Sequence, residues 1–327
     1  MNEITPFLPA ISCASPGPDE ILLAPVKIDG KWGFIDRSGK IAIKPQFEDA
    51  EDFQEGLAMI QLGSKLGFID KNGKIAINPQ FGKAGSFQEG LAWIRLDDKY
   101  GYIDKTGKIA IKPQFEDAED FQEGMASIKI ERKWGFIDKT GKIAINPKFN
   151  FAGNFQEGLA GIELGDRYGF IDKAGKIAIK PKFYLALDFQ EGMASIKLGR
   201  KWGYIDKNGK IAIKPQFNFA ESFKEGLAGI QLDGNKCGYI DKTGRIAIKP
   251  QFRGALDFQE GMASIKLGRK WGYIDKNGKI VIKPKFVGAG WFQEGLASIK
   301  LGSKLGYIDK SGKIVINPQF EGAGFFN

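Results

Sequence analysis

The chain of 327 residues is 43% hydrophobic and 27% charged, which is the composition of an ordinary globular protein. It has no histidine, the commonest general base, and its two cysteines, Cys13 and Cys237, argue against a structural disulfide or a zinc site. The formal charge of +9 is spread thinly among acidic neighbours and does not favour a specific nucleic-acid role. We therefore expect no enzyme activity, no catalytic residues, no metal and no cofactor.

Residues 1–18 are expected to form an N-terminal tail, and residues 19–327 a single domain. The tail has no basic n-region, and Pro6 and Pro9 interrupt its apolar residues, so no standard secretory signal is evident. This slightly favours a cytoplasmic location. No stretch of the sequence approaches the apolar length that a membrane span needs.

The rest of the chain repeats one pattern nine times. A glycine preceded by Lys-x or Arg-x recurs at positions 33, 67, 101, 135, 169, 203, 238, 272 and 306, a period of 34 with one step of 35. The stretch from Leu187 to Ile211 returns letter for letter from Leu256 to Ile280. Such self-similarity predicts a tandem-repeat architecture.

Each repeat reads as three short β-strands, exemplified by residues 296–301, 133–138 and 40–45. Two residues such as Gly63-Ser64 separate the first pair of strands, which predicts a tight primed hairpin turn. An Asp-Lys-x-Gly type of sequence separates the second pair and predicts a type I turn. Both faces of these strands carry apolar residues, so each small sheet must be covered by its neighbours.

The remaining segment of each repeat, such as residues 45–56, joins one sheet to the next. Pro45 ends the third strand, and Phe47, Ala50 and Phe53 follow at a spacing of three. This spacing predicts a short helical or 3₁₀ turn that packs these side chains between adjacent sheets.

Two all-β architectures fit the repeats: a closed propeller-like toroid and an open superhelical stack. The end repeats are as apolar as the middle ones, whereas an open array needs polar caps. The first repeat lacks a connector at its start, and the ninth ends just after one, so joining the ends would complete nine units. Against closure, propellers usually have four to eight blades of four strands, and Pro25 indicates a less regular edge. We favour the closed toroid, built of nine three-stranded units.

The sequence KWGFIDKTGKIAI, together with FQEGLA, resembles the bacterial WG-repeat (KWG) family over about residues 19–327. The resemblance implies a β-rich repeat array that interacts with ligands or proteins, and it brings no common enzymatic activity. The tryptophan is kept as Trp32, Trp134, Trp202 and Trp271. Its replacements in the other repeats are Leu66, Tyr100, Tyr168, Cys237 and Leu305. Replacement by such different apolar groups favours a packing role for this position.

Two rows of carboxylates recur most faithfully. One row precedes the turn between the second and third strands: Asp36, Asp70, Asp104, Asp138, Asp172, Asp206, Asp241, Asp275 and Asp309. The other precedes a glycine: Glu55, Glu89, Glu123, Glu157, Glu191, Glu225, Glu260 and Glu294. Calcium ligation or acid catalysis would use such groups. We favour structural roles, because an aspartate at this turn position accepts backbone hydrogen bonds and the glutamate can hold a lysine or a connector amide.

Positions that break the repeat provide candidate partner-binding residues. They are Trp93, Phe151, Tyr184, Phe219, Arg253 and Trp291. Aromatic residues at such points are favoured binding anchors, although drift or local packing between units would also explain them. We expect a monomeric, non-enzymatic scaffold that binds a protein or peptide, including an acidic one, through loops between blades or a central channel. A lectin-like multivalent binder of bacterial glycans is the alternative.

Overall fold

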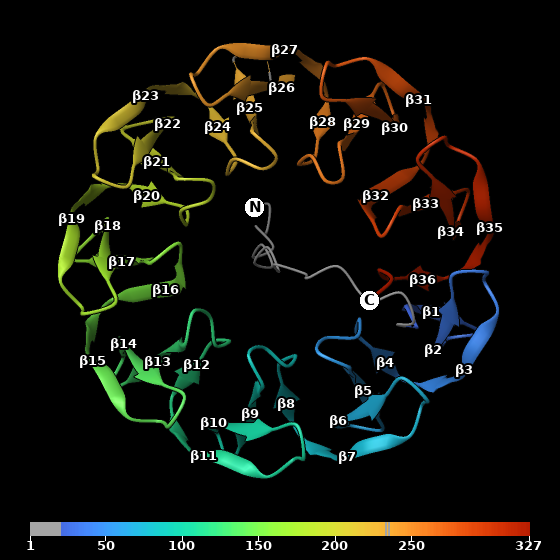
Figure 1. The fold of residues 1–327 in the computed structure, drawn as a ribbon, viewed down its shortest axis with the longest axis horizontal. Helices are drawn as coiled ribbons and strands as arrows, with labels where there is room; N and C mark the ends of the chain where they lie inside the picture. The colour runs from blue at the N-terminus through green and yellow to red at the C-terminus, as the bar shows by residue number, and fades with distance from the viewer. Residues whose placement is uncertain (1–20, 233, 235) are drawn as a thin grey trace.

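The computed structural model describes residues 21–232, 234 and 236–327, which form nine four-stranded antiparallel sheets arranged in a ring (Figure 1). The chain is therefore a nine-bladed β-propeller, and the expectation of a closed toroid is confirmed. Residues 1–18, including Cys13, lie outside the described residues. Within the described ranges, no helix is long and apolar enough to cross a membrane.

The four strands of a blade follow one another from the ring axis outward (Figure 1). The inner strands are β4 (Asp49–Ala50), β8 (Lys83–Ala84), β12 (Asp117–Ala118), β16 (Phe151–Gln156), β20 (Leu185–Ala186), β24 (Phe219–Ala220), β28 (Gly254–Ala255), β32 (Gly288–Gln293) and β36 (Gly322–Ala323). The second strands are β1 (Leu23–Ile28), β5 (Leu57–Leu62), β9 (Leu91–Leu96), β13 (Met125–Ile130), β17 (Leu159–Leu164), β21 (Met193–Leu198), β25 (Leu227–Leu232), β29 (Met262–Leu267) and β33 (Leu296–Leu301).

The two remaining strands of each blade lie farther from the axis (Figure 1). The third strands are β2 (Lys31–Asp36), β6 (Lys65–Asp70), β10 (Lys99–Asp104), β14 (Lys133–Asp138), β18 (Arg167–Asp172), β22 (Lys201–Asp206), β26 (Lys236–Asp241), β30 (Lys270–Asp275) and β34 (Lys304–Asp309). The outer strands are β3 (Ile41–Phe47), β7 (Ile75–Phe81), β11 (Ile109–Phe115), β15 (Ile143–Phe149), β19 (Ile177–Phe183), β23 (Ile211–Phe217), β27 (Ile246–Phe252), β31 (Ile280–Phe286) and β35 (Ile314–Phe320).

Blade 1 is completed by strands from opposite ends of the chain. It consists of β36, β1, β2 and β3, while blade 2 is β4–β7 and the following blades take four consecutive strands each, up to β32–β35 in blade 9. Strand β36 pairs with β1, and main-chain hydrogen bonds of 3.1 and 3.2 Å join Leu23 and Asn327. Closure thus pairs a strand edge that an open array would leave exposed.

The connector, which we expected to form a helical turn, instead forms the inner strand of the next blade. Asp49 and Ala50 pair with Gln61 and Ile60, so each unit contributes four strands rather than three. The prediction of a helical turn was wrong, because the spacing of three between residues such as Ala152 and Phe155 comes from a bulge in the inner strand. In blade 5 the pairing breaks after Ala152 and resumes at Phe155, so two intervening residues bulge out of the ladder.

Apolar clusters fill the interfaces between neighbouring blades. Phe34 of blade 1 meets Phe53 of blade 2 with ring centroids 4.9 Å apart, and an equivalent pair recurs at every interface of the described ring. The pair that closes the ring is Tyr307 of blade 9 and Phe326 of blade 1, at 5.0 Å. The connector phenylalanines therefore pack between sheets as expected, and each blade depends on both neighbours.

The Trp-Gly pair has a steric explanation. The outer strand crosses close to the third strand at Gly33, and a Cβ there would lie 2.5 Å from the Ile43 carbonyl oxygen and 2.6 Å from the Pro45 nitrogen. Only glycine avoids this backbone clash. The preceding tryptophan packs, as expected: Trp134 is 7% exposed and Trp202 is 5% exposed.

Candidate interaction surface

The ring has two unlike faces, because successive turns of an antiparallel blade alternate between its sides. We call one the latch face. It carries the turns between inner and second strands, such as residues 54–57, and those between third and outer strands, such as residues 36–40. We call the other the hairpin face. It carries the second-to-third-strand hairpins, such as residues 62–65, and the crossings from one blade to the next, such as residues 47–49.

The aspartate row stabilises the turns of the latch face. Asp36 Oδ1 accepts hydrogen bonds from the backbone N–H of Ser38 at 2.9 Å and of Lys40 at 3.1 Å, and from the Ser38 hydroxyl at 2.6 Å. The Ser38 hydroxyl and these amides hold the pKa of Asp36 below its usual range. The same contacts recur around the ring, for example at Asp138. This row is therefore part of the fold, as the turn chemistry predicted.

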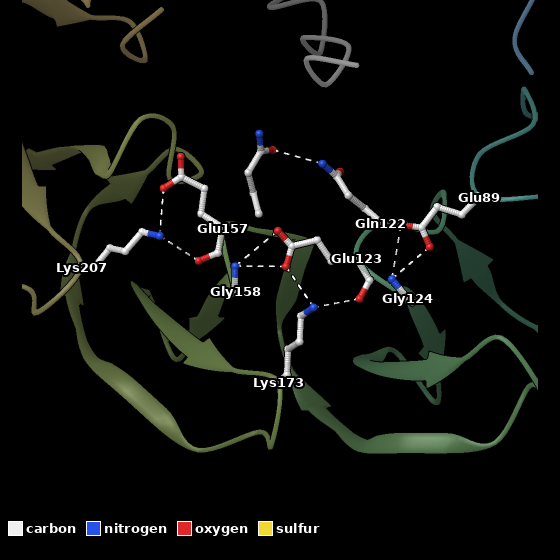
Figure 2. Close-up of polar contacts among 9 residues, drawn as sticks. Glu89, Gln122, Glu123, Gly124, Glu157, Gly158, Lys173 and Lys207 are labelled. Carbon is white, nitrogen blue, oxygen red and sulfur yellow. Dashed lines mark hydrogen bonds and ion pairs between the residues drawn. The ribbon is translucent and has the colours of Figure 1, made fainter. Parts of the chain in front are cut away.

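The glutamate row links each blade to the next (Figure 2). Glu123 Oε2 of blade 4 accepts a hydrogen bond of 3.0 Å from the Gly158 N–H of blade 5. Lys173, also of blade 5, lies 3.1 Å from the same carboxylate and donates a 2.9 Å hydrogen bond to the Glu123 carbonyl oxygen. We call this arrangement a Glu–Gly–Lys latch. Latches centred on Glu55, Glu89, Glu123, Glu157, Glu191, Glu225 and Glu260 are present in the described structure.

On the hairpin face, the residue after an outer strand caps a hairpin in several blades. Glu48 Oε2 accepts a 3.1 Å hydrogen bond from the Gly63 N–H, while its Oε1 pairs with Lys31 at 2.7 Å. Asn150 has the same role in blade 5, where its side-chain amide donates to the Gly165 carbonyl at 2.8 Å. A polar side chain at this position therefore stabilises the hairpin beside it.

Tyr184 occupies the capping position of blade 6 without capping. Its side chain is 57% exposed and has no hydrogen bond among the described residues. The guanidinium carbon of Arg167 lies 4.3 Å from the centre of its ring, a cation–π contact that holds the ring at the surface. Tyr184 therefore keeps the contact with a basic residue that Glu48 makes with Lys31, but it leaves the hairpin beside it without a cap.

Two groups stand out among the exposed large apolar side chains. One recurs around the ring at the start of the outer strands, as at Ile41 and Ile75. The other gathers on the hairpin face of blades 5, 6 and 7, and four of its six members break the repeat. We call it the aromatic arc, and it consists of Phe151, Leu164, Tyr184, Leu185, Leu198 and Phe219. Val287 of blade 9 is exposed as well, but six such side chains on three consecutive blades form an apolar surface that is typical of an interaction site.

The arc contains three of the six residues singled out from the sequence: Phe151, Tyr184 and Phe219. Arg253 is exposed in blade 8, at the position equivalent to Tyr184, and lies beyond one end of the arc. Leu164 and Leu198, two of the three leucines of the arc, were not anticipated, because they occupy ordinary repeat positions whose side chains are more buried in the other blades.

Trp93 and Trp291 lie apart from the arc, half-buried against neighbouring blades. The Trp93 ring packs 5.6 Å from the Tyr100 ring, and its indole N–H donates a hydrogen bond to Asp120 of blade 4. Trp291 stacks on Phe325 with centroids 5.9 Å apart. Its buried indole nitrogen has no hydrogen-bond partner in the part of the chain that the structure describes.

Carboxyl groups beside the inner strands are buried in the wall between blades. Burial is the main cause that raises the pKa of Asp52, Asp120 and Asp188 to about 6. Burial, followed by neighbouring carboxylates, raises the pKa of Glu119 and Glu221 to about 7. In residues 21–232, 234 and 236–327, no three such groups, alone or with a cysteine, are placed to hold a metal ion.

Comparisons with known proteins agree with the repeat and the fold. The family model described as WG containing repeat matches residues 32–65, 67–100, 100–134, 134–168, 168–202, 202–236, 238–271, 271–304 and 306–327. No curated protein matches the chain.

Solved structures share the fold at low sequence identity. A crystal structure of the eukaryotic initiation factor is 11% identical, covers 94% of this chain and 98% of its own, and has a TM-score of 0.68. Dihydro-heme d1 dehydrogenase NirN in complex with DHE is 12% identical, covers 97% of this chain and 76% of its own, and has a TM-score of 0.50. At such identities the likeness concerns the fold alone.

Proposed function

Since the chain belongs to the family of WG-containing-repeat proteins and its repeats close into a propeller, we propose that it is a non-catalytic scaffold that binds a protein or peptide partner on the aromatic arc. The observation that carries the proposal is the contrast between equivalent positions. Glu48 and Asn150 cap hairpins, whereas Tyr184 leaves its hairpin uncapped and exposes its ring. Exposed, pre-positioned aromatic side chains are the usual anchors of protein interfaces.

The charges around the arc favour a partner with acidic residues beside its apolar ones. Arg167 and Arg200 are exposed on the hairpins of blades 5 and 6, and Arg253 is exposed on blade 8, so these cations outnumber Asp166, which is exposed beside Arg167. Opposite charges at the rim of an interface accelerate association and set its orientation. We therefore propose an amphipathic peptide segment with acidic flanks as the partner.

The test is selection from a random peptide library displayed on phage, followed by affinity measurement with the selected synthetic peptides. We expect peptides that combine apolar and acidic residues, and we expect Tyr184→Ser to weaken their binding about tenfold or more, which corresponds to about 1.4 kcal/mol. A matched control is Ile41→Ser, since Ile41 is also exposed, at 46%, but belongs to the recurring group.

Equal binding by the two variants would contradict the location of the site. A glycan array screened with the same proteins separates the lectin alternative. Saturable glycan binding that Tyr184→Ser removes, with no peptide selected, would replace the peptide proposal by the glycan one.

A further inference from the structure

A small pocket lies between blades 7 and 8, at the end of the aromatic arc. Its volume is about 80 Å³. Phe219 of the arc forms one side, while Cys237, Gly229 and Ala255 contribute further apolar surface, and Glu221 lies along the wall. We call it the blade-7 pocket.

The pocket exists because blade 7 lacks a tryptophan that its neighbours have. Cys237 stands at the position of Trp202 in blade 6 and Trp271 in blade 8. In blade 8 the Trp271 ring lies against Gly254 and Lys266. The residues equivalent to those two in blade 7 are Phe219 and Gln231, and both line the pocket. The blade-7 pocket therefore corresponds to the tryptophan site with its ring missing.

The adjacent position widens the same space. Gly229 stands where blade 3 has Trp93, whose ring packs against Tyr100, the counterpart of Cys237. Blade 7 thus has neither the tryptophan of blades 6 and 8 nor a side chain at the position that Trp93 occupies in blade 3. Because this site lacks the large aromatic side chain of the neighbouring blades, it can accept a side chain from another molecule.

The polar group in the pocket favours a hydrogen-bond donor. The Glu221 carboxylate has no hydrogen bond or ion pair among the described residues, and burial together with Asp257 raises its pKa to about 7. In blade 3, the indole N–H of Trp93 donates to Asp120, the counterpart of Asp257. An indole can therefore meet both requirements, since it brings a large apolar ring and one donor.

Cys237 is not an activated nucleophile at this site. Burial, followed by the negative charge of Glu221, raises the pKa of its thiol, so the reactive thiolate is disfavoured. The thiol serves as a small apolar group in the wall of the pocket.

We propose that the blade-7 pocket is the anchor site for a tryptophan side chain of the partner. The indole would lie against Phe219 and Cys237, and its N–H would donate to Glu221. This assignment rests on the proposed function, because it names the side chain that the partner brings to the end of the aromatic arc. A deeply seated aromatic anchor beside an exposed apolar surface is the common organisation of an interface hot spot.

The first experiment uses a free probe, so it does not need the partner. Cys13→Ser leaves Cys237 as the single thiol, and its alkylation by N-ethylmaleimide is followed with and without N-acetyl-tryptophanamide. At about ten times the Kd of the probe, we expect alkylation to slow about tenfold, because only the empty pocket reacts. N-acetyl-alaninamide is the control and should give no protection. Equal rates with both compounds, at all concentrations up to solubility, would overturn the proposal.

The second experiment fills the pocket from within. Cys237→Trp restores the residue of neighbouring blades and should abolish saturation-transfer NMR signals from indole, while Cys237→Ser should keep them. Indene, which lacks the N–H, should bind the unaltered protein several-fold more weakly than indole does. Glu221→Met, which removes the acceptor oxygens, should weaken the binding of indole by about the same factor. Retention of the indole signal in a folded Cys237→Trp variant would place the probe elsewhere and contradict the assignment.

These results separate the pocket from the arc. If arc variants abolish peptide binding while Cys237→Trp leaves it unchanged, the proposed function stands and the tryptophan anchor is wrong. If indole protects Cys237 although no peptide is selected, the pocket stands and the proposed partner class is wrong.

Discussion

Buried carboxyl groups are the residues whose chemistry departs furthest from that of the surface. Asp188 of blade 6 lies against Gly153 and Gly161 of blade 5, and burial alone raises its pKa from 3.8 to about 6. The folded state therefore prefers the protonated form of this group. The contribution of Asp188 to the free energy of unfolding is highest at and below its unfolded pKa near 4, and it falls as the pH rises through about 6.

We expect the melting temperature to be higher at pH 5 than at pH 8, and Asp188→Asn to raise it at pH 8 with little effect at pH 5. The gain at pH 8 should be about 1–3 kcal/mol, because each pKa unit corresponds to about 1.4 kcal/mol. Blade 5 already has Asn154 at the equivalent position, so the amide fits. Asp98→Asn, on an exposed side chain, is the control. A loss of stability at pH 8 in Asp188→Asn would contradict this account.

The turns between inner and second strands combine backbone strain with an inter-blade contact. Glu123 and Gly124 both have positive φ, of 53° and 83°, in a two-residue loop where asparagine or aspartate would be preferred over glutamate. The longer side chain is explained by the Glu–Gly–Lys latch, since it must reach Gly158 and Lys173 of the next blade.

Replacing Glu123 by asparagine should therefore relax the turn but remove the latch, with a net loss of about 1 kcal/mol in the free energy of unfolding. A double-mutant cycle with Lys173→Ala, measured by urea denaturation, should give a coupling energy of about 0.5–1 kcal/mol that decreases at high salt. A coupling energy of zero at low salt would show that only the hydrogen bond to Gly158 matters.

Closure makes the two ends of the chain as important as its middle. Phe326, the penultimate residue, is 1% exposed and packs on Tyr307, as Phe121 packs on Tyr102 in the middle of the ring. In an open stack, a phenylalanine so close to the end of the chain would contribute little.

We expect Phe326→Ala to lower the free energy of unfolding by about 3–5 kcal/mol, close to the effect of Phe121→Ala, because both substitutions empty a buried site between two blades. Thermal and urea denaturation of both variants measure this. A nearly neutral Phe326→Ala beside a strongly destabilised Phe121→Ala would show that the ring is open in solution.

The sequence predicts much of this architecture because its signals are local and repeated. Asp36 and Gly39 specify a turn whose geometry requires only neighbouring residues, and nine copies predicted the ring from the way its ends fit together. The inner strand was missed because its pairing is interrupted, so residues such as Asp49 and Ala50 show no alternation long enough to predict a strand.

The candidate site is less visible in the sequence, for a physical reason. Tyr184 could be singled out because it breaks the repeat, whereas the exposure of Leu198 depends on which side chains its neighbours provide. The blade-7 pocket was not anticipated either. The substitution of Cys237 for tryptophan was visible, but the open space is also lined by Gly229 and by Ala255 of the next blade, whose positions the sequence alone did not bring together.

The closure of blade 1 by both ends of the chain has a consequence for how such proteins can change over generations. The identical stretches Leu187–Ile211 and Leu256–Ile280 lie two blades apart, so unequal recombination between them would remove or add two complete blades in frame. Because blade 1 would still be formed by the same terminal strands, the shorter or longer product would retain its closing seam. Ring size in this architecture can therefore be varied genetically in whole blades, while the junction that joins the ends remains unaltered.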